Sequence, residues 1–395
     1  MGAIKFFSDD LDVRGKKILL RLDLNVPIID GNIRDTTRID LILPILKTLI
    51  KKKAKIIIIS HLGRPIGKKD QNLSLIPVYK FLKKKISSSM YFYTGEINKD
   101  TKEKFSYLND GEIILLENIR FNKGEQSDDD EFAETLSSLG NVYINEAFSC
   151  SHRKEASMQI GKYVKEKYAG PLLKKEIESI NYILENKLRP TSCIIGGSKI
   201  SSKIKVIKNL IKKVDNIIIV GAMANNFLDY EKIKIGKSLI EKNVNPIIKQ
   251  IFQLADKNQC KIFIPNDYQV SESPNGSARY ADKNTIGKDD MILDIGKKTL
   301  KTINKLIDES KTLMWNGPAG YFENKEFAYG TFEIAKKISD NTKNGNLISI
   351  VGGGDTISAV NNIKEKLSFS HLSTAGGAFL ELLEGKDLPG LKVLK

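Results

Sequence analysis

The sequence predicts an α/β protein made of two doubly wound parallel-sheet domains joined by a helix. Short β-branched apolar runs recur along the chain, each followed by polar or glycine-rich residues and then by a longer helical pattern. Continuous apolar strands that alternate with helices are typical of parallel sheets covered on both faces. A chain of 395 residues also exceeds one ordinary hydrophobic core, which favours two domains.

Nine segments fit the strand pattern, in two groups along the chain. The first group is 18–23, 55–60, 112–116 and 142–145. The second group is 192–195, 216–220, 261–265, 312–315 and 347–351. Ligands of such sheets bind outside the carboxyl ends of the strands, so the residues that follow each strand are the first candidates for a site.

Residues 169–188 are expected to form the helix that connects the domains. Apolar residues recur there at helical spacing, namely Leu172, Leu173, Ile177, Ile180, Ile183 and Leu184. Strand–helix alternation restarts after Pro190, which places the domains at 1–168 and 189–377. An ordinary amphipathic surface helix is the alternative interpretation.

Composition argues against several classes of protein. The net charge is +15, but lysine is spread along the whole chain without an arginine-rich or aromatic-interleaved stripe, so we expect no nucleic-acid partner. Three cysteines without a Cys-x-x-Cys pair argue against a disulfide framework or a zinc site. The first residues include no apolar signal segment, and no apolar run approaches the roughly 20 residues of a membrane span. We expect a cytoplasmic monomer without a membrane partner.

Arginine is rare and concentrated in the first part of the chain. Among 63 Lys and Arg residues only nine are Arg, and none lies beyond Arg279. Five of the nine and two of the three His occupy short motifs: 21–27 (RLDLNVP), Arg38, 60–65 (SHLGRP), 116–121 (LENIRF) and 152–153 (HR). The planar arginine fork pairs well with carboxylate and phosphate, so these strand-end motifs predict an anion site in the first domain.

Glycine clusters follow the strands of the second half. They are 196–203 (GGSKISSK), 221–223 (GAM), 315–318 (WNGP), 352–356 (GGGDT) and 373–377 (STAGG). Glycine lets backbone N–H groups approach phosphate, and a following helix presents its positive end. We expect Lys199 and Lys203 in a first helical turn, facing one phosphate chain, and Asp355 in position to bind Mg²⁺. Together the clusters predict a nucleotide site.

Other motifs of catalysis or nucleotide binding are missing from the sequence. Residues 236–238 (GKS) look like the end of a P-loop, but Glu231 stands where that motif requires glycine. The early strands are not followed by Gly-x-Gly-x-x-Gly, and neither Gly-x-Ser-x-Gly nor His-Glu-x-x-His occurs.

The motifs above, with 380–386 (LELLEGK), run in order from about residue 5 to residue 390, and together they resemble the phosphoglycerate kinase family. The resemblance implies two α/β domains of similar size, with the tail 378–395 packing back on the first domain. It also implies reversible phosphoryl transfer: 1,3-bisphosphoglycerate and ADP give 3-phosphoglycerate and ATP, a step of glycolysis and gluconeogenesis.

The resemblance further implies the residues of the site. Those that would hold 3-phosphoglycerate are Asp23, Leu24, Asn25, Arg38, His61, Leu62, Gly63, Arg64, Arg120 and Arg153. Those that would hold ATP or ADP are Gly197, Ser198, Lys199, Lys203, Gly221, Asn316, Pro318, Glu323, Gly352, Gly353, Gly354, Asp355 and Thr356. Asp355 would bind Mg²⁺ and Glu323 the ribose. Arg38, Lys203 and Gly376 would act in catalysis.

The chemistry needs no general base. A carboxylate acceptor has an unperturbed pKa of roughly 3.5 to 4 and is ionised at pH 7. Phosphoryl transfer requires in-line positioning and neutralisation of charge. We expect Arg38 to donate to the transferring group in the transition state, aided by Lys203 and Mg²⁺. Separate sites on two domains further predict closure before the reaction.

Four positions depart from the family pattern. They are Glu146 for Asp, Glu155 for His, Ser202 for Asp and Ala375 for Gly. Ordinary drift is one interpretation. The alternatives are a paralogue that acts on another phosphorylated acid, and a catalytically weak binding protein of the same fold.

Overall fold

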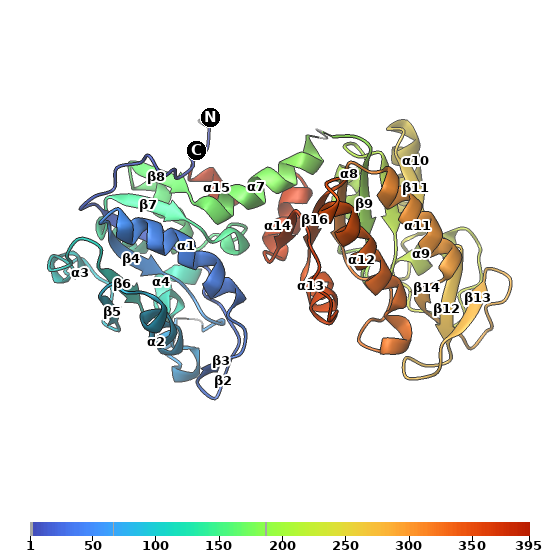
Figure 1. The fold of residues 1–395 in the computed structure, drawn as a ribbon, viewed down its shortest axis with the longest axis horizontal. Coiled ribbons are helices and arrows are strands. Elements are labelled where there is room, and N and C mark those ends of the chain that lie inside the picture. Colours follow the sequence, from blue (N-terminus) through green and yellow to red (C-terminus); the bar gives the residue numbers. More distant parts are fainter. Residues whose placement is uncertain (1–2, 66, 186–187) are drawn as a thin grey trace. The chain divides into compact units, whose positions relative to one another are not determined.

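The structure, a computed structural model, describes residues 3–65, 67–185 and 188–395 (Figure 1). The chain divides into two compact units: unit 1 is 1–176 with 387–395, and unit 2 is 177–386. The division falls within helix α7 (Pro171–Leu184), which forms inside the predicted segment 169–188. Residues 186 and 187 of that segment lie outside the described residues.

Unit 1 contains a six-stranded parallel sheet with the order β5-β6-β4-β1-β7-β8. Its strands are β5 (Met90–Tyr93), β6 (Ile113–Leu116), β4 (Lys55–Ile59), β1 (Lys17–Arg21), β7 (Val142–Asn145) and β8 (Glu166–Ala169). In β1, Ile18 and Leu20 pack into a cluster with Ile42 and Leu46 of α1, while Leu19 on the opposite face is equally buried. Burial on both faces explains why the strands are continuously apolar.

Helices and short elements cover this sheet (Figure 1). The helices are α1 (Thr37–Lys51), α2 (Ile76–Lys85), α3 (Thr101–Lys104), α4 (Lys123–Gln126), α5 (Asp130–Ser138), α6 (Ala156–Gln159) and α15 (Pro389–Lys392). Single 3₁₀ turns occupy Gln71–Leu73, Ile119–Phe121, Phe148–Cys150 and Ile160–Lys162, and a hairpin pairs β2 (Ile28–Ile29) with β3 (Asn32–Ile33).

Unit 2 contains a second six-stranded parallel sheet, in the order β11-β10-β9-β15-β16-β17. Its strands are β9 (Thr191–Ile195), β10 (Asn216–Ile219), β11 (Lys261–Phe263), β15 (Thr312–Asn316), β16 (Ile348–Gly352) and β17 (His371–Ser373). Numbered along the chain, this is the order 3-2-1-4-5-6 of doubly wound dinucleotide-binding sheets, with the switch point between β9 and β15.

Beyond α7, the described residues of unit 2 also form the helices α8 to α14 and an antiparallel sheet, β13-β12-β14. The helices are α8 (Ile204–Leu210), α9 (Ala224–Tyr230), α10 (Asn245–Lys257), α11 (Lys297–Glu309), α12 (Tyr329–Lys343), α13 (Gly354–Asn361) and α14 (Gly377–Leu383), with a 3₁₀ turn at Lys325–Phe327. The sheet comprises β12 (Asp267–Ser271), β13 (Arg279–Asp282) and β14 (Met291–Ile295).

The predicted fold class is confirmed, and each of the nine predicted strands is present with its ends shifted by at most two residues. The strands that were not predicted are mostly edge strands, such as β8 with its partly exposed Glu166 and Lys167, or members of the antiparallel sheet. No helix of the described chain combines the length and apolarity that crossing a membrane requires.

The carboxyl-terminal tail of unit 1 is shorter than the predicted 378–395. Residues 377–386 pack within unit 2, where α14 lies against α8 and the Asn209 amide donates to the Leu383 carbonyl at 2.7 Å. Residues 387–395 belong to unit 1, where Gly390 N–H donates to the Ser151 carbonyl at 2.9 Å. The difference arises because the apolar face of α14, including Phe379 and Leu383, is buried in unit 2.

Glu146 holds the first turn of α7 from the loop after β7. Its Oε2 accepts the backbone N–H groups of Leu172 at 2.8 Å and Leu173 at 3.1 Å. The side chain is packed tightly against Gly170, where an added Cβ would lie 2.2 Å from the glutamate carboxyl carbon. Burial raises the pKa of Glu146 to about 8.

This burial predicts a pH-dependent stability. Since the folded state binds the proton more tightly than the unfolded state, the contribution of Glu146 is complete below the unfolded pKa near 4.5 and declines as the pH rises toward 8. Glu146→Gln is therefore expected to be close to the wild type in stability at pH 5 and to be more stable by about 4 kcal/mol at pH 9. Thermal unfolding of both proteins across this range tests the prediction, and parallel pH profiles would contradict it.

Candidate active site

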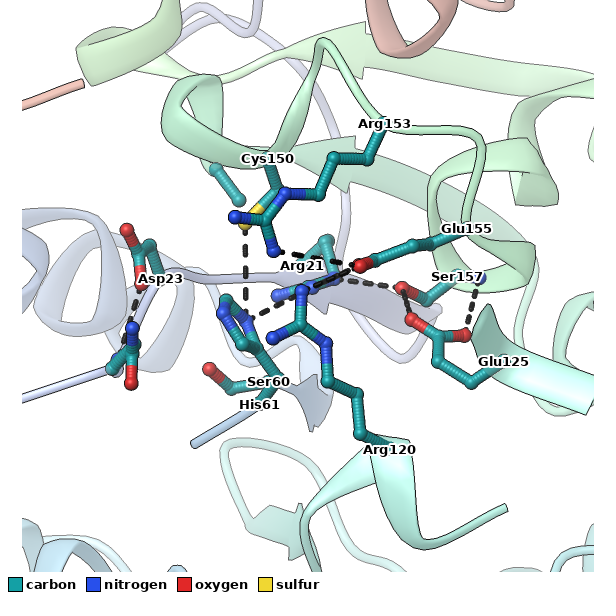
Figure 2. Close-up of polar contacts among 12 residues, drawn as sticks. Arg21, Asp23, Ser60, His61, Arg120, Glu125, Cys150, Arg153, Glu155 and Ser157 are labelled. Carbon is teal, nitrogen blue, oxygen red and sulfur yellow. Dashed lines mark hydrogen bonds and ion pairs between the residues drawn. The ribbon is translucent and has the colours of Figure 1, made fainter. Parts of the chain in front are cut away.

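Four neighbouring strands of unit 1 end in a cluster of arginines around one histidine (Figure 2). We define the arginine cluster as Arg21, Arg38, Arg120 and Arg153 with His61. Arg21 ends β1, His61 follows β4, Arg120 follows β6, and Arg153 lies in the loop after β7. Because β6, β4, β1 and β7 are adjacent and parallel, their carboxyl ends place these side chains at one edge.

His61 is neutral in this cluster. It is 3% exposed, and burial together with the four guanidinium groups holds the pKa of His61 well below its usual range. Arg21 Nη2 lies 3.3 Å from His61 Nδ1. A guanidinium group can only donate, so Nδ1 accepts and the ring proton resides on Nε2. His61 is thus prepared to donate a hydrogen bond to an anion.

Arg120 is held by contacts from the loops after β4 and β7. Its Nη1 donates to the Gly63 carbonyl at 2.5 Å, and its Nη2 lies 2.5 Å from Glu155 Oε1. The amide of Asn118 donates to the Leu62 carbonyl at 2.7 Å, which joins the loops after β4 and β6. Gly63 has a φ of +61°, and an added Cβ would lie 2.5 Å from Leu73, so this turn requires glycine.

Arg38 reaches the cluster from α1. Its Nη1 lies 2.5 Å from Asp23 Oδ2 and 3.2 Å from the Asn25 carbonyl. Asn25 in turn accepts the Gly63 N–H at 3.0 Å, and the Ser149 hydroxyl donates to Asp23. The Arg38 side chain remains 29% exposed, in contrast to the buried Arg21 and Arg120.

The predicted substrate residues therefore fall into three groups. Asp23, Asn25, Arg38, His61, Gly63, Arg120 and Arg153 come together at this edge. Leu24 and Leu62 are buried and contribute backbone groups, Leu24 through its N–H bond to Ser60 Oγ at 3.0 Å. Arg64 is exposed and takes no part in the cluster's hydrogen bonds and ion pairs, as far as the structure describes them.

The cluster does not favour a metal ion. Among the described residues, Asp23, His61 and Cys150 form a group of three potential ligands, with one ligand atom each within 4.8 Å of the others. Burial raises the pKa of the Cys150 thiol, and the surrounding guanidinium groups repel a cation. The arrangement suits an anion.

In unit 2, glycine turns meet at the switch point between β9 and β15. Gly196 follows β9 and Gly317 follows β15, and an added Cβ on Gly196 would lie 2.3 Å from the Pro318 carbonyl oxygen and 2.7 Å from that of Gly317. The Gly317 N–H donates to Thr356 Oγ1 at 2.7 Å, which joins this turn to α13. The close approach of the two turns explains why glycine occupies both positions.

Asn316 connects three strand ends. Its amide nitrogen donates to the Gly352 carbonyl at 2.7 Å, and its side-chain oxygen accepts from the Lys203 ammonium. Lys203 is partly buried; burial lowers its pKa, while nearby Asp355 acts in the opposite direction. Gly353, with a φ of +104°, lies against the Asn316 amide nitrogen, where an added Cβ would come within 2.6 Å.

The prediction that Lys199 and Lys203 share a first helical turn is wrong. Helix α8 begins at Ile204, and 201–203 form a turn before it. Ser201 donates to Glu241 through its N–H at 2.9 Å and its hydroxyl at 2.6 Å, so side-chain contacts hold this segment instead of helical ones. Lys199 is exposed, whereas Lys203 enters the site.

A pocket of about 410 Å³ opens beside these turns within unit 2. Its lining includes six predicted nucleotide residues: Gly197, Ser198, Gly221, Pro318, Glu323 and Asp355. The rest of the lining is mostly apolar and makes up the apolar wall, with Leu228, Leu239, Tyr268, Ile292 and Phe322 among its members. A largely apolar lining with glycine turns and a few polar groups is the arrangement of a small-ligand site.

Asp355 has the surroundings that Mg²⁺ would need. It is exposed in the first turn of α13, beside Gly354, where an added Cβ would meet no atom within 4 Å. Mg²⁺ is commonly bound by one or two carboxylates together with substrate phosphates, so a single exposed carboxylate at a glycine turn fits the ion. Gly376 precedes α14 with a φ of +53°, and an added Cβ at this position would also meet no atom within 4 Å.

Sequence reasoning missed some residues of both sites. Arg21 lies in the motif 21–27, and its position at the end of an apolar strand is the signal that could have identified it as a site residue. Glu125 is buried against Ser157 near Arg21, and nothing in its local sequence distinguishes it. The apolar pocket wall cannot be distinguished from core residues by spacing alone.

The two sheets and their edge residues define the class: an α/β enzyme whose sites suit phosphorylated ligands. A family model described as phosphoglycerate kinase matches residues 8–386. A phosphoglycerate kinase of Wolbachia sp. subsp. Drosophila simulans is 44% identical over 98% of both chains, and one of Rhizobium meliloti is 40% identical over 100% of this chain and 99% of its own. The chain therefore belongs to the phosphoglycerate kinase family.

Solved structures agree with this assignment. The structure of phosphoglycerate kinase from Coxiella burnetii matches with a TM-score of 0.89 and 37% identity, over 98% of this chain and 97% of that one. Phosphoglycerate kinase from Pyrococcus horikoshii OT3 matches with a TM-score of 0.80 and 27% identity, over 98% of both chains.

Proposed function

We propose that the chain catalyses reversible phosphoryl transfer between ATP and the carboxylate of 3-phosphoglycerate. The observation that carries this proposal is the arginine cluster at the carboxyl edge of the unit 1 sheet, in a member of this family. Four guanidinium groups and a neutral histidine provide donors for a phosphate and a carboxylate on one small acid.

The cluster would bind and orient the phosphorylated acid. Arg120 and Arg153 would hold its phosphate, with His61 donating through Nε2. Asp23 and Asn25 would accept from its hydroxyl or position Arg38, which contacts both residues. Arg38 reaches this edge from α1 and keeps its side chain 29% exposed. It would donate to the phosphoryl group during transfer.

The pocket of unit 2 would bind the nucleotide. Its apolar wall would take the base, Glu323 the ribose, and the turns at Gly197 and Gly353 the phosphates. Lys203, oriented by Asn316, would neutralise charge on the transferring group. When bound through Asp355, Mg²⁺ would supply further neutralisation of the nucleotide phosphates.

A mutation in each unit separates the two ligand assignments. Asp355→Asn is expected to raise KM for Mg-ATP about tenfold, because the variant loses the carboxylate charge at the phosphates, and to leave KM for 3-phosphoglycerate within twofold. Arg153→Ala is expected to give the reverse pattern, with loss of a charge-assisted bond worth about 1.5–3 kcal/mol. Steady-state kinetics with each substrate varied in turn measures both. Equal effects on both KM values in either variant would contradict the assignment.

A substrate panel tests the proposed reaction. ADP release should depend on 3-phosphoglycerate and should be at least 100-fold slower with phosphorylated acids of other lengths or with unphosphorylated glycerate. Faster turnover with another phosphorylated acid would assign the chain a different substrate. A monomeric, cytoplasmic enzyme without nucleic-acid or membrane partners remains a prediction from the sequence.

A further inference from the structure

The arginine cluster contains a buried carboxylate of its own. Glu155 is 4% exposed and follows Arg153 by two residues. Its Oε1 lies 2.5 Å from Arg120 Nη2 and 3.6 Å from Arg153 Nη1, and its Oε2 lies 3.8 Å from Arg21 Nη2 (Figure 2). One glutamate therefore contacts three of the four arginines.

The other carboxylates near the cluster have different partners. Glu125 is fully buried and accepts the N–H of Ser157 at 2.8 Å and its hydroxyl at 2.5 Å. Burial raises the pKa of Glu125. Asp23 pairs with Arg38. Within the described residues, the ion pairs of Arg120 and Arg153 are made with Glu155 alone.

These contacts engage terminal nitrogens of Arg120 that would also donate to an incoming phosphate. Both terminal nitrogens of Arg120 are engaged, Nη1 with the Gly63 carbonyl and Nη2 with Glu155. Glu155 Oε2 is buried without a hydrogen bond, so the carboxylate is held by charge and by one close contact. A phosphate that binds Arg120 and Arg153 has to displace this carboxylate or accept its repulsion.

We propose that Glu155 is a specificity-determining residue: an internal anion that competes with the ligand phosphate for Arg120 and Arg153. The proposal rests on the proposed function, in which these arginines bind the phosphate of the acid. In the ligand-free protein Glu155 neutralises part of the cluster's charge. This contact favours a ligand that offers a second anionic group to the remaining arginines over a single small anion.

Removal of the carboxylate is expected to tighten anion binding. Glu155→Gln keeps the shape and removes the charge, so its Kd for inorganic phosphate should fall about tenfold, which corresponds to about 1.4 kcal/mol. The Kd for 3-phosphoglycerate should fall by a smaller factor, since the second anionic group of this ligand already binds the remaining arginines. The ligand-free variant should also unfold at a lower temperature than the wild type, because three guanidinium groups lose a counter-ion, and phosphate should restore its stability.

Isothermal titration of inorganic phosphate and of 3-phosphoglycerate into the full-length protein tests this inference. Glu166→Gln is the matched control. Glu166 lies at the start of β8 and pairs with Lys16, and this variant changes the net charge by the same amount as Glu155→Gln. Glu155→Ser provides a second removal of the carboxylate if the glutamine variant does not fold. Tighter binding in either Glu155 variant, with the control unchanged, supports competition.

Unchanged or weaker phosphate binding in the Glu155 variants would overturn the proposal, because the carboxylate would then position the arginines or act elsewhere. Turnover distinguishes this failure from a failure of the proposed function. If wild type phosphorylates 3-phosphoglycerate while the Kd values do not shift, competition alone is wrong. If wild type neither turns over nor binds 3-phosphoglycerate, the assignment of the cluster fails as well.

Discussion

Replacement of Arg38 by alanine is expected to lower kcat by about 10³-fold or more, the size of an arginine contact to a transferring phosphoryl group. Arg38 is held by Asp23 and the Asn25 carbonyl while its side chain remains 29% exposed, so the guanidinium is oriented yet accessible. KM for 3-phosphoglycerate should change less than kcat, because the remaining arginines would still bind the acid. Steady-state kinetics with Mg-ATP and 3-phosphoglycerate measures both quantities.

Arg14→Ala is the control for this variant. Arg14 is an exposed arginine of unit 1 before β1, so its removal changes charge without entering the cluster. Its kcat should equal that of the wild type. Retention of more than a tenth of the wild-type kcat in a folded Arg38→Ala protein would show that Arg38 does not act in the transition state.

Replacement of Gly196 by alanine is expected to lower nucleotide affinity about 100-fold, or about 2.7 kcal/mol. The new Cβ would lie 2.3 Å from the Pro318 carbonyl oxygen, and backbone on both sides of the switch point leaves no flexible side chain to move aside. The turns that border the pocket must then separate. Unit 2 should also lose about 3 kcal/mol of stability through overpacking.

Gly354→Ala is the matched control for unfolding, since its Cβ would meet no atom within 4 Å. Calorimetry should distinguish the two variants, because the unfolding temperature should fall for Gly196→Ala and remain at the wild-type value for Gly354→Ala. Titration with ADP then measures the affinity of the folded Gly196→Ala protein. If Gly196→Ala unfolds at the wild-type temperature and binds ADP with the wild-type affinity, the close approach of the two turns is contradicted.

The sequence allowed the sheet strands and the arginine cluster to be predicted for a clear physical reason. Buried parallel strands such as β7 must be apolar on both faces, and the polar residues that follow them lie at one edge. Arg38, His61 and Arg120 were predictable in this way because arginine is scarce in this lysine-rich chain. The antiparallel strands β12 to β14 were not, because their residues alternate between buried and exposed less regularly.

Other features depend on contacts between distant residues. The turn before α8 is held by Glu241, some 40 residues away, so the local spacing of Lys199 and Lys203 gave a false helix. The sequence marked Glu146 and Glu155 as departures, but only their surroundings reveal a helix anchor and an internal anion. Apolar pocket residues such as Leu239 follow the same patterns as core residues, so their role required the fold.

The most direct test of the proposed reaction is to trap its product. A carboxylate that accepts a phosphoryl group becomes an acyl phosphate, which hydroxylamine converts to a hydroxamate. Incubation of the protein with Mg-ATP, 3-phosphoglycerate and hydroxylamine should form hydroxamate and ADP in equal amounts, and neither should form without 3-phosphoglycerate. Phosphoryl transfer to the carboxylate would be contradicted by release of ADP that depends on 3-phosphoglycerate but yields no hydroxamate. It would also be contradicted if well-folded protein released no ADP.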